Sequence, residues 1–62
     1  MDQRHKDMCE WAYEVMEETE VLYEAIDDGD YVTAVASLFA TEVGLAHLRK
    51  LMEPIEVSNG VN

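Results

Sequence analysis

The chain has 62 residues, 14 acidic and 4 basic, and a formal net charge of −10 at pH 7. A chain of this length forms at most one small domain, and so negative a charge disfavours direct binding to nucleic acid or to an anionic membrane. The single cysteine, Cys9, excludes an internal disulfide and fits a reducing cytoplasm. Since the sequence has no zinc-finger spacing either, we expect oligomerisation to stabilise so small a fold.

The residues from about 2 to 27 are predicted to form an amphipathic helix. Neither glycine nor proline occurs before Gly29, and apolar residues recur in alternating steps of four and three. The predicted apolar stripe consists of Met8, Ala12, Val15, Thr19, Leu22 and Ile26, with Trp11 and Ala25 widening it. Asp2 stands where an N-cap residue is expected.

A turn is predicted over residues 28–30. Gly29 can adopt the left-handed conformation that ends a helix, and Asp30 can cap the next helix by accepting from the amide of Thr33. Because the connection is so short, the two helices should be antiparallel neighbours.

A second helix is predicted over residues 31–52, approximately. Between Val32 and Leu48 its only ionised side chain is Glu42. A helix that is apolar around most of its circumference needs cover on more than one side, which a single partner helix cannot give. We therefore predict an all-α fold, an antiparallel two-helix hairpin that forms a homodimer with the architecture of a four-helix bundle.

Small residues four positions apart in this second helix would let two copies approach closely. Together with their apolar neighbours they form the predicted dimer interface, which comprises Val35, Ala36, Phe39, Ala40, Val43 and Gly44. The alternative is that the small residues, with the adjacent Thr33, Ser37 and Thr41, form only a thin polar stripe on the helix surface.

Pro54 is expected to end the second helix, since proline cannot donate the next backbone hydrogen bond. The hairpin domain should therefore cover residues 1–54, and residues 55–62 should form a flexible C-terminal tail. The second helix is long enough to span a membrane, but an acid such as Glu42 at depth costs ~2.5–3.5 kcal/mol. No signal peptide is visible in the polar first residues, and we expect a cytoplasmic protein without a membrane contact.

Acidic residues recur on the first helix in steps of three, four or seven, opposite its apolar stripe. The predicted acidic surface comprises Asp7, Glu10, Glu14, Glu17, Glu20, Glu24 and Asp28, with Tyr13 as a possible anchor among them. It can be a solvated helix face and nothing more. Almost no lysine is mixed in, however, and like charges four apart, such as Glu10 and Glu14, are mildly destabilising. The pattern therefore also fits a docking surface for a basic partner.

Metal and catalytic chemistry have little support in the sequence. His5 and Cys9 are four apart, and His47 could approach them from the second helix, but no repeated metal-binding motif is present. We read Cys9 as a small core residue. No nucleophile motif or phosphate-binding loop occurs. We predict no catalytic residue, no metal site and no cofactor, and hence a protein that is not an enzyme.

Two resemblances accompany this interpretation. The size and hairpin plan resemble those of Rop-type proteins, small chains that dimerise into four-helix bundles, although the basic surface of an RNA binder is absent here. The segment AIDDGDYVTAV is similar to helix–turn–helix hairpins of tetratricopeptide and HEPN-like domains. Both resemblances imply a helical hairpin, and neither implies a function.

The function we expect is that of a small acidic interaction protein. It would bind a basic surface of a larger protein, one that handles nucleic acid, and inhibit or modulate it, as a nucleic-acid mimic of the kind found in phage and mobile elements. The alternative is a structural or adaptor subunit whose apolar second helix completes the helical bundle of a partner.

Overall fold

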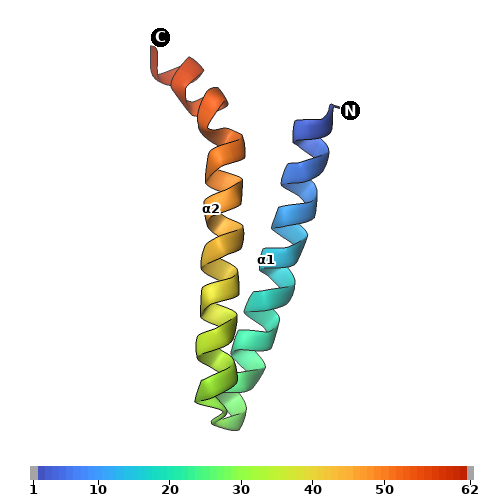
Figure 1. Cartoon of the computed structure of the whole chain (residues 1–62), viewed down its shortest axis with the longest axis vertical. Coiled ribbons are helices and arrows are strands. Elements are labelled where there is room, and N and C mark those ends of the chain that lie inside the picture. The colour runs from blue at the N-terminus through green and yellow to red at the C-terminus, as the bar shows by residue number, and fades with distance from the viewer. Residues whose placement is uncertain (1, 62) are drawn as a thin grey trace.

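The computed structural model describes the backbone of residues 2–61 and the side chains of residues 2–53. Within this range the chain forms two helices, α1 (Gln3–Asp28) and α2 (Tyr31–Val61). Figure 1 shows them running side by side in opposite directions, close together at the turn and further apart toward the two termini. The predicted helical hairpin is therefore confirmed.

Both predicted N-caps are present. The Asp2 carboxylate accepts from the backbone amide of His5 at 2.8 Å, which satisfies one of the free amides at the start of α1. At the start of α2, Asp30 accepts from the amide of Thr33 at 3.2 Å and from its hydroxyl at 2.6 Å. These bonds fix where each helix begins.

Gly29 ends α1 in the predicted left-handed conformation, with φ 75°. In this conformation its amide donates to the carbonyls of Ala25 and Ile26, and the next amide, that of Asp30, donates to the Ala25 carbonyl at 2.8 Å. The last carbonyls of α1 are thus satisfied while the chain reverses, and α2 starts beside the end of α1.

The two helices pack along one line of contact, which we call the seam. In each helix its residues recur in alternating steps of three and four and are buried or half-buried. The seam comprises Met8, Trp11, Val15, Glu18, Leu22 and Ala25 on α1 and Ala34, Ser37, Thr41, Gly44, Leu48 and Leu51 on α2. The α1 side is mostly large and the α2 side is mostly small, so that the helices can approach closely.

The stripe predicted on α1 is corrected at three positions. Ala12, Thr19 and Ile26 are exposed. The seam passes instead through Trp11 and Ala25, which were predicted only to widen the stripe, and through Glu18, which was not predicted in it. The apolar part of α1 is wider than one neighbouring helix can cover. Close packing near the turn selects the small Ala25, which is 5% exposed, over the larger Ile26, which is 53% exposed.

The C-terminal end of α2 also differs from the prediction. The helix continues through Pro54 to Val61, where the sequence predicted an end near residue 52 and a flexible tail over residues 55–62. Proline removes one backbone hydrogen bond but does not prevent later residues from resuming the helix after a bend. Figure 1 shows α2 bending over its last turns. The side chains of the predicted tail lie outside the described residues.

Candidate functional site

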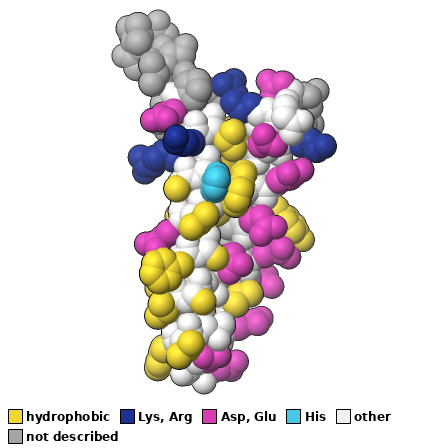
Figure 2. Space-filling view, in the orientation of Figure 1, with side chains coloured by type: hydrophobic (Ala, Val, Ile, Leu, Met, Phe, Trp, Pro, Cys, Tyr) yellow, Lys and Arg dark blue, Asp and Glu magenta, His cyan; other side chains and the backbone are white. Residues whose placement is uncertain are grey.

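The acidic surface lies along α1. Of its eight members only Asp7 is half-buried, and its carboxylate accepts from the Gln3 side chain at 2.8 Å. The other seven are exposed: Glu10, Tyr13, Glu14, Glu17, Glu20, Glu24 and Asp28. At 1.5 Å per residue the row is ~30 Å long. Figure 2 shows acidic side chains gathered over α1 and hydrophobic ones over α2 on the same face.

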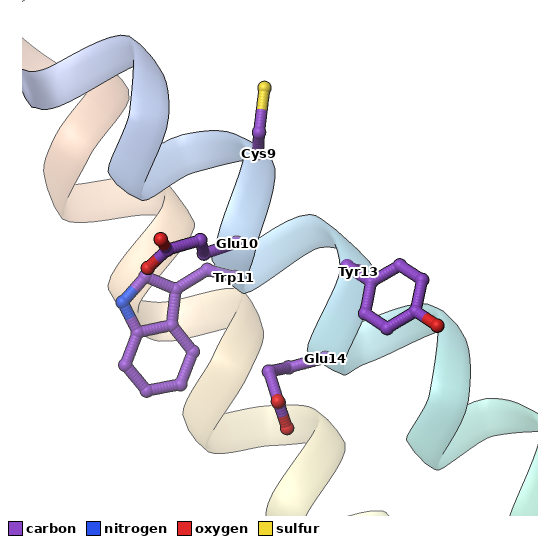
Figure 3. A pocket seen from close by; sticks show the side chains of 5 residues that line it. All are labelled: Cys9, Glu10, Trp11, Tyr13 and Glu14. Carbon is purple, nitrogen blue, oxygen red and sulfur yellow. The ribbon is translucent and has the colours of Figure 1, made fainter.

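Tyr13 belongs to a depression on this surface that has both acidic and aromatic walls. It is shallow and is lined by Cys9, Glu10, Trp11, Tyr13 and Glu14. Figure 3 shows that Trp11 turns toward α2, whereas Cys9 and Tyr13 point away from it. Tyr13 is 56% exposed, so its ring is available to a partner. The carboxylates of Glu10, three residues before it, and Glu14, one residue after it, lie on either side of it in the sequence.

The outer side of α2 carries large apolar side chains that the hairpin does not cover. Val32 is 84% exposed and Phe39 is 65% exposed. Others are about half exposed: Val35, Leu38, Val43, Leu45 and Met52. Among the side chains of residues 2–53 no large one is fully buried, and the buried hydrophobic residues are Ala25 and Ala34. The hairpin therefore has little core of its own.

The residues predicted to form the dimer interface are divided between the two sides of α2. Val35, Ala36, Phe39 and Val43 are on the exposed outer side. Ala40 is half-buried, whereas Gly44 is buried in the seam, where a Cβ atom would lie 2.6 Å from Cγ2 of Val15. Gly44 is thus needed for packing within one chain. The row of small residues, Ala36, Ala40 and Gly44, runs from the surface into the seam. A step of four residues is slightly more than one turn, so successive members of the row shift around the helix.

The seam carries more polar groups than the apolar pattern of the sequence predicts. Ser37 and Thr41 are 3% and 8% exposed, and the Thr41 hydroxyl has no hydrogen-bond partner in the described part of the chain. The contacts of Val15 with Gly44 and of Trp11 with His47 set the register, and this register places the half-buried Glu18 opposite Thr41. A polar centre of this kind weakens the hairpin as a free-standing unit.

The residues weighed as metal ligands occupy two separate places. The Cys9 thiol lies 3.6 Å from Nε2 of His5, and Cys9 is exposed, which corrects its interpretation as a core residue. His47 instead stacks on Trp11, with ring centroids 4.1 Å apart and an interplanar angle of 6°. Within the described residues no group of three histidine, cysteine or acidic side chains is arranged to hold a metal ion.

The stack of Trp11 on His47 is the feature of this surface that sequence reasoning missed. The sequence predicts Trp11 at the edge of the apolar stripe, and it suggests His47 only as a residue that could approach His5 and Cys9. The pairing of Trp11 with His47 depends on the antiparallel register, since one precedes the turn by 18 residues and the other follows it by 18. Their equal separation from Gly29 was the feature of the sequence from which this pairing could have been predicted.

One helical stretch, Tyr31–Glu53, is long and apolar enough to cross a membrane when judged by length and composition alone. Core helices of soluble proteins meet the same criterion. Glu42 lies in the middle of this stretch and is exposed. The composition therefore indicates a helix that needs apolar cover, without identifying lipid as that cover.

Fold and surface together define a helical hairpin in which one helix is acidic and the other has an apolar outer side. Comparison with protein-family models, with curated proteins and with solved structures finds no match for the chain. Its function is inferred below from these two surfaces.

Proposed function

We propose that the protein is a small, non-enzymatic interaction protein that binds a basic surface of a larger protein and thereby inhibits or modulates it. The observation that carries this proposal is the separation of charge between the helices. Residues 1–30 hold eleven of the fourteen acidic residues, and no lysine or arginine occurs between Lys6 and Arg49. A surface selected only for solubility and stability would mix both signs.

The chemistry of the acidic surface favours a partner that itself handles nucleic acid. Carboxylates repeat along ~30 Å of α1 and present a row of negative charge, as a phosphate backbone does. A protein with a basic nucleic-acid groove would be attracted to such a row over long range. Tyr13, exposed among the carboxylates, supplies an aromatic contact of the kind that is enriched at binding hot spots.

We also propose that the hairpin is half of a four-helix bundle formed by two copies of the chain. The support is its small core: the large apolar side chains of α2 lie outside, while small and polar residues occupy the seam. Burial of an exposed leucine or phenylalanine contributes ~1.5–3 kcal/mol, which two copies can gain together.

A second candidate function follows from the exposure of Phe39 and Val32 on α2. In this alternative the chain is a structural or adaptor subunit, and the outer side of α2 completes the helical bundle of a different protein. Salt separates the two candidates. A complex formed by the acidic surface weakens steeply as ionic strength rises, whereas an apolar one hardly changes.

The test is affinity capture of the partner from the native cell, followed by binding measurements with two matched double variants. Glu14→Lys with Glu17→Lys reverses charge at the centre of the acidic surface. Glu42→Lys with Glu53→Lys makes the same charge change on α2. We expect the first variant to abolish binding, mainly through the association rate, and the second to retain it. Equal binding by both variants and the original chain would leave the acidic surface as a solvated face.

Competition distinguishes a nucleic-acid mimic from other acidic binders. If the acidic surface occupies the nucleic-acid groove of the partner, then the DNA or RNA of that partner and this protein must exclude each other. Simultaneous binding of both would rule out mimicry and leave a docking site elsewhere on the partner.

A further inference from the structure

We propose that two copies of this chain pair through one particular side of the hairpin, with α1 of each copy packed on α2 of the other. This proposal rests on the dimer proposed above and specifies its contact face and the pairing of its helices.

The hairpin has two broad sides, one on either side of the seam. Residues that directly follow Trp11, Glu18 and Ala25 on α1, and Ser37, Gly44 and Leu51 on α2, all border the same side. The reason is that two antiparallel helices are related by a twofold axis normal to the plane of the hairpin. Such an axis does not exchange the two broad sides, so residues at the same position relative to the seam lie on the same broad side in both helices. We call this side the uncharged face. It comprises Ala12, Thr19 and Ile26 on α1 and Leu38, Leu45 and Met52 on α2.

Every member of the uncharged face is exposed, and none is ionised. Met16, Tyr23 and Val35 extend it at its margins and are 53%, 72% and 51% exposed. Glu42 and Arg49 follow Val35 by seven and fourteen residues on the same margin of α2, and they line a shallow depression together with Leu45 and Met52, so this margin carries one charge of each sign. The opposite broad side differs sharply, since it is bordered on α1 by Asp7 and Glu14, which directly precede the seam residues Met8 and Val15. Two chains that each carry a charge of −10 can meet on the uncharged face while keeping most of their carboxylates away from the contact.

The uncharged face is also complementary to itself in shape. Its α1 half begins with small side chains, Ala12 and Thr19, and its α2 half has the large Leu38, Leu45 and Met52. A twofold axis parallel to the helices places the large Leu38 and Leu45 of each copy over the small Thr19 and Ala12 of the other, while Ile26 lies nearer the turn. An isologous interface requires this kind of self-complementarity. A face on a hairpin of 47 by 24 Å is broad enough for the ~800 Å² that each partner buries in a standard interface.

Charge selects this pairing over the other twofold arrangement. α1 contains nine acidic and two basic residues, whereas α2 contains three and two. A twofold axis perpendicular to the helices would stack α1 on α1, bringing the two acidic helices together. The parallel axis places the acidic helices at diagonal corners of the bundle, where they are furthest apart, and packs each on the nearly neutral α2 of the partner.

The first experiment measures dimerisation by analytical ultracentrifugation of two single variants. Leu45→Glu puts a charge into the uncharged face, and Val43→Glu makes the same change at an exposed position of α2 outside that face. The two positions are 50% and 52% exposed, so they are matched in the hairpin. We expect Leu45→Glu to raise the dimer dissociation constant at least about a hundredfold and Val43→Glu to leave the dimer intact. The reverse order, or a dimer indifferent to both, would overturn the proposal.

The second experiment tests the pairing without disturbing the fold, by cross-linking engineered cysteines with a short bismaleimide in a Cys9→Ala background. Thr19 and Leu38 both belong to the uncharged face and lie ten and nine residues from Gly29, so they are at similar distances from the turn. A mixture of Thr19→Cys chains with Leu38→Cys chains should give the mixed cross-link, while Thr19→Cys alone should give none. A strong product from Thr19→Cys alone would indicate that α1 packs on α1 and overturn the proposed pairing.

Both experiments use this chain alone, so their outcome is independent of whether a basic partner exists. A monomer that binds neutral phosphatidylcholine vesicles would also overturn the proposal, because lipid would then be the cover of the apolar face. Loss of partner binding by the acidic-surface variants would leave the dimer result unchanged.

Discussion

Trp11 and His47 stack face to face across the hairpin, with their ring centroids 4.1 Å apart and their planes 6° from parallel. The contact joins α1 to α2, which Figure 1 shows moving apart from the turn toward the two termini. Toward the turn the seam holds the helices together through small residues. On the terminal side of Gly44 this aromatic pair joins the helices through two large rings.

Replacing His47 by alanine should therefore loosen the open end of the hairpin. Stacked aromatic pairs contribute ~0.5–1.5 kcal/mol beyond the area they bury, so we expect the free energy of unfolding to fall by about that amount. Trp11 is the only tryptophan, and its fluorescence should shift to longer wavelength as the indole becomes more exposed. Urea unfolding followed by fluorescence measures both effects in one experiment.

Two further variants make the result specific to the stack. His47→Phe keeps a flat ring against Trp11 and should preserve most of the stability. His5→Ala removes the other histidine, which contacts Cys9 and not Trp11, and should leave the emission of Trp11 unchanged. If His47→Ala alters neither stability nor emission, the stack has no energetic role.

The local features of this fold could be predicted from sequence because each depends on a few neighbouring residues. Asp2, Gly29 and Asp30 act as helix caps through bonds within four residues, and composition alone separates the acidic helix from the apolar one. The seam was harder to predict. The apolar stripe of α1 is broad, and the choice between Ala25 and Ile26 depends on how closely α2 approaches, which the sequence of α1 does not contain.

The candidate site divides in the same way. The acidic surface on α1 was predictable, because a helix period and a charge pattern suffice to align it. The roles of Gly44 and His47 were not, since each depends on a residue of the other helix, Val15 and Trp11 respectively. Pro54 shows a further limit: the rule that proline ends a helix is a local preference, and α2 continues past it to Val61.

Gly44 and Val15 should be strongly coupled in stability. In Gly44→Ala the added methyl would lie 2.6 Å from Cγ2 of Val15, and such overpacking costs ~1–3 kcal/mol. The same change removes a glycine from a helix interior, which stabilises by ~1 kcal/mol. We expect the cost to exceed the gain in the original chain. In a Val15→Ala background the clash is gone, and Gly44→Ala should then raise the free energy of unfolding.

A double-mutant cycle by urea denaturation measures this coupling directly. Gly29→Ala serves as the contrast. A Cβ at Gly29 would meet no atom within 4 Å, but φ of 75° is unfavourable for alanine. Gly29→Ala should therefore destabilise the chain to the same extent with or without Val15→Ala. An additive cycle for Gly44 and Val15 would contradict the close contact.

Thr41→Val should stabilise the protein. The Thr41 hydroxyl is buried in the seam without a hydrogen-bond partner, and an unsatisfied buried polar group costs ~1–3 kcal/mol. Valine has nearly the same shape and no hydroxyl, so we expect the free energy of unfolding to rise by about 1 kcal/mol. Thr41→Ser keeps the hydroxyl and loses a buried methyl, and it should be less stable than the original chain. Destabilisation by valine would mean that the hydroxyl is bonded.

The Asp30 cap should contribute stability that depends on pH. Hydrogen bonds from the Thr33 side chain and then from its backbone amide lower the pKa of Asp30 below the ordinary value of 3.8. Because the folded pKa is the lower one, the stabilisation is fully present above the unfolded pKa and is lost as pH falls through the folded pKa. At pH 7, Asp30→Ala should therefore lower the midpoint of thermal unfolding, and the difference from the original chain should shrink below about pH 4.

The difference between the two proteins is the quantity to follow in this last experiment, at one fixed protein concentration. Acidification also neutralises the other carboxylates of a chain with net charge −10, which relieves repulsion and moves both midpoints together. Asp28→Ala is the matched control. Asp28 ends α1, where the helix dipole disfavours a negative charge, so its removal should leave stability unchanged or slightly higher at pH 7. A loss from Asp28→Ala equal to that from Asp30→Ala would trace the effect to net charge and not to the cap.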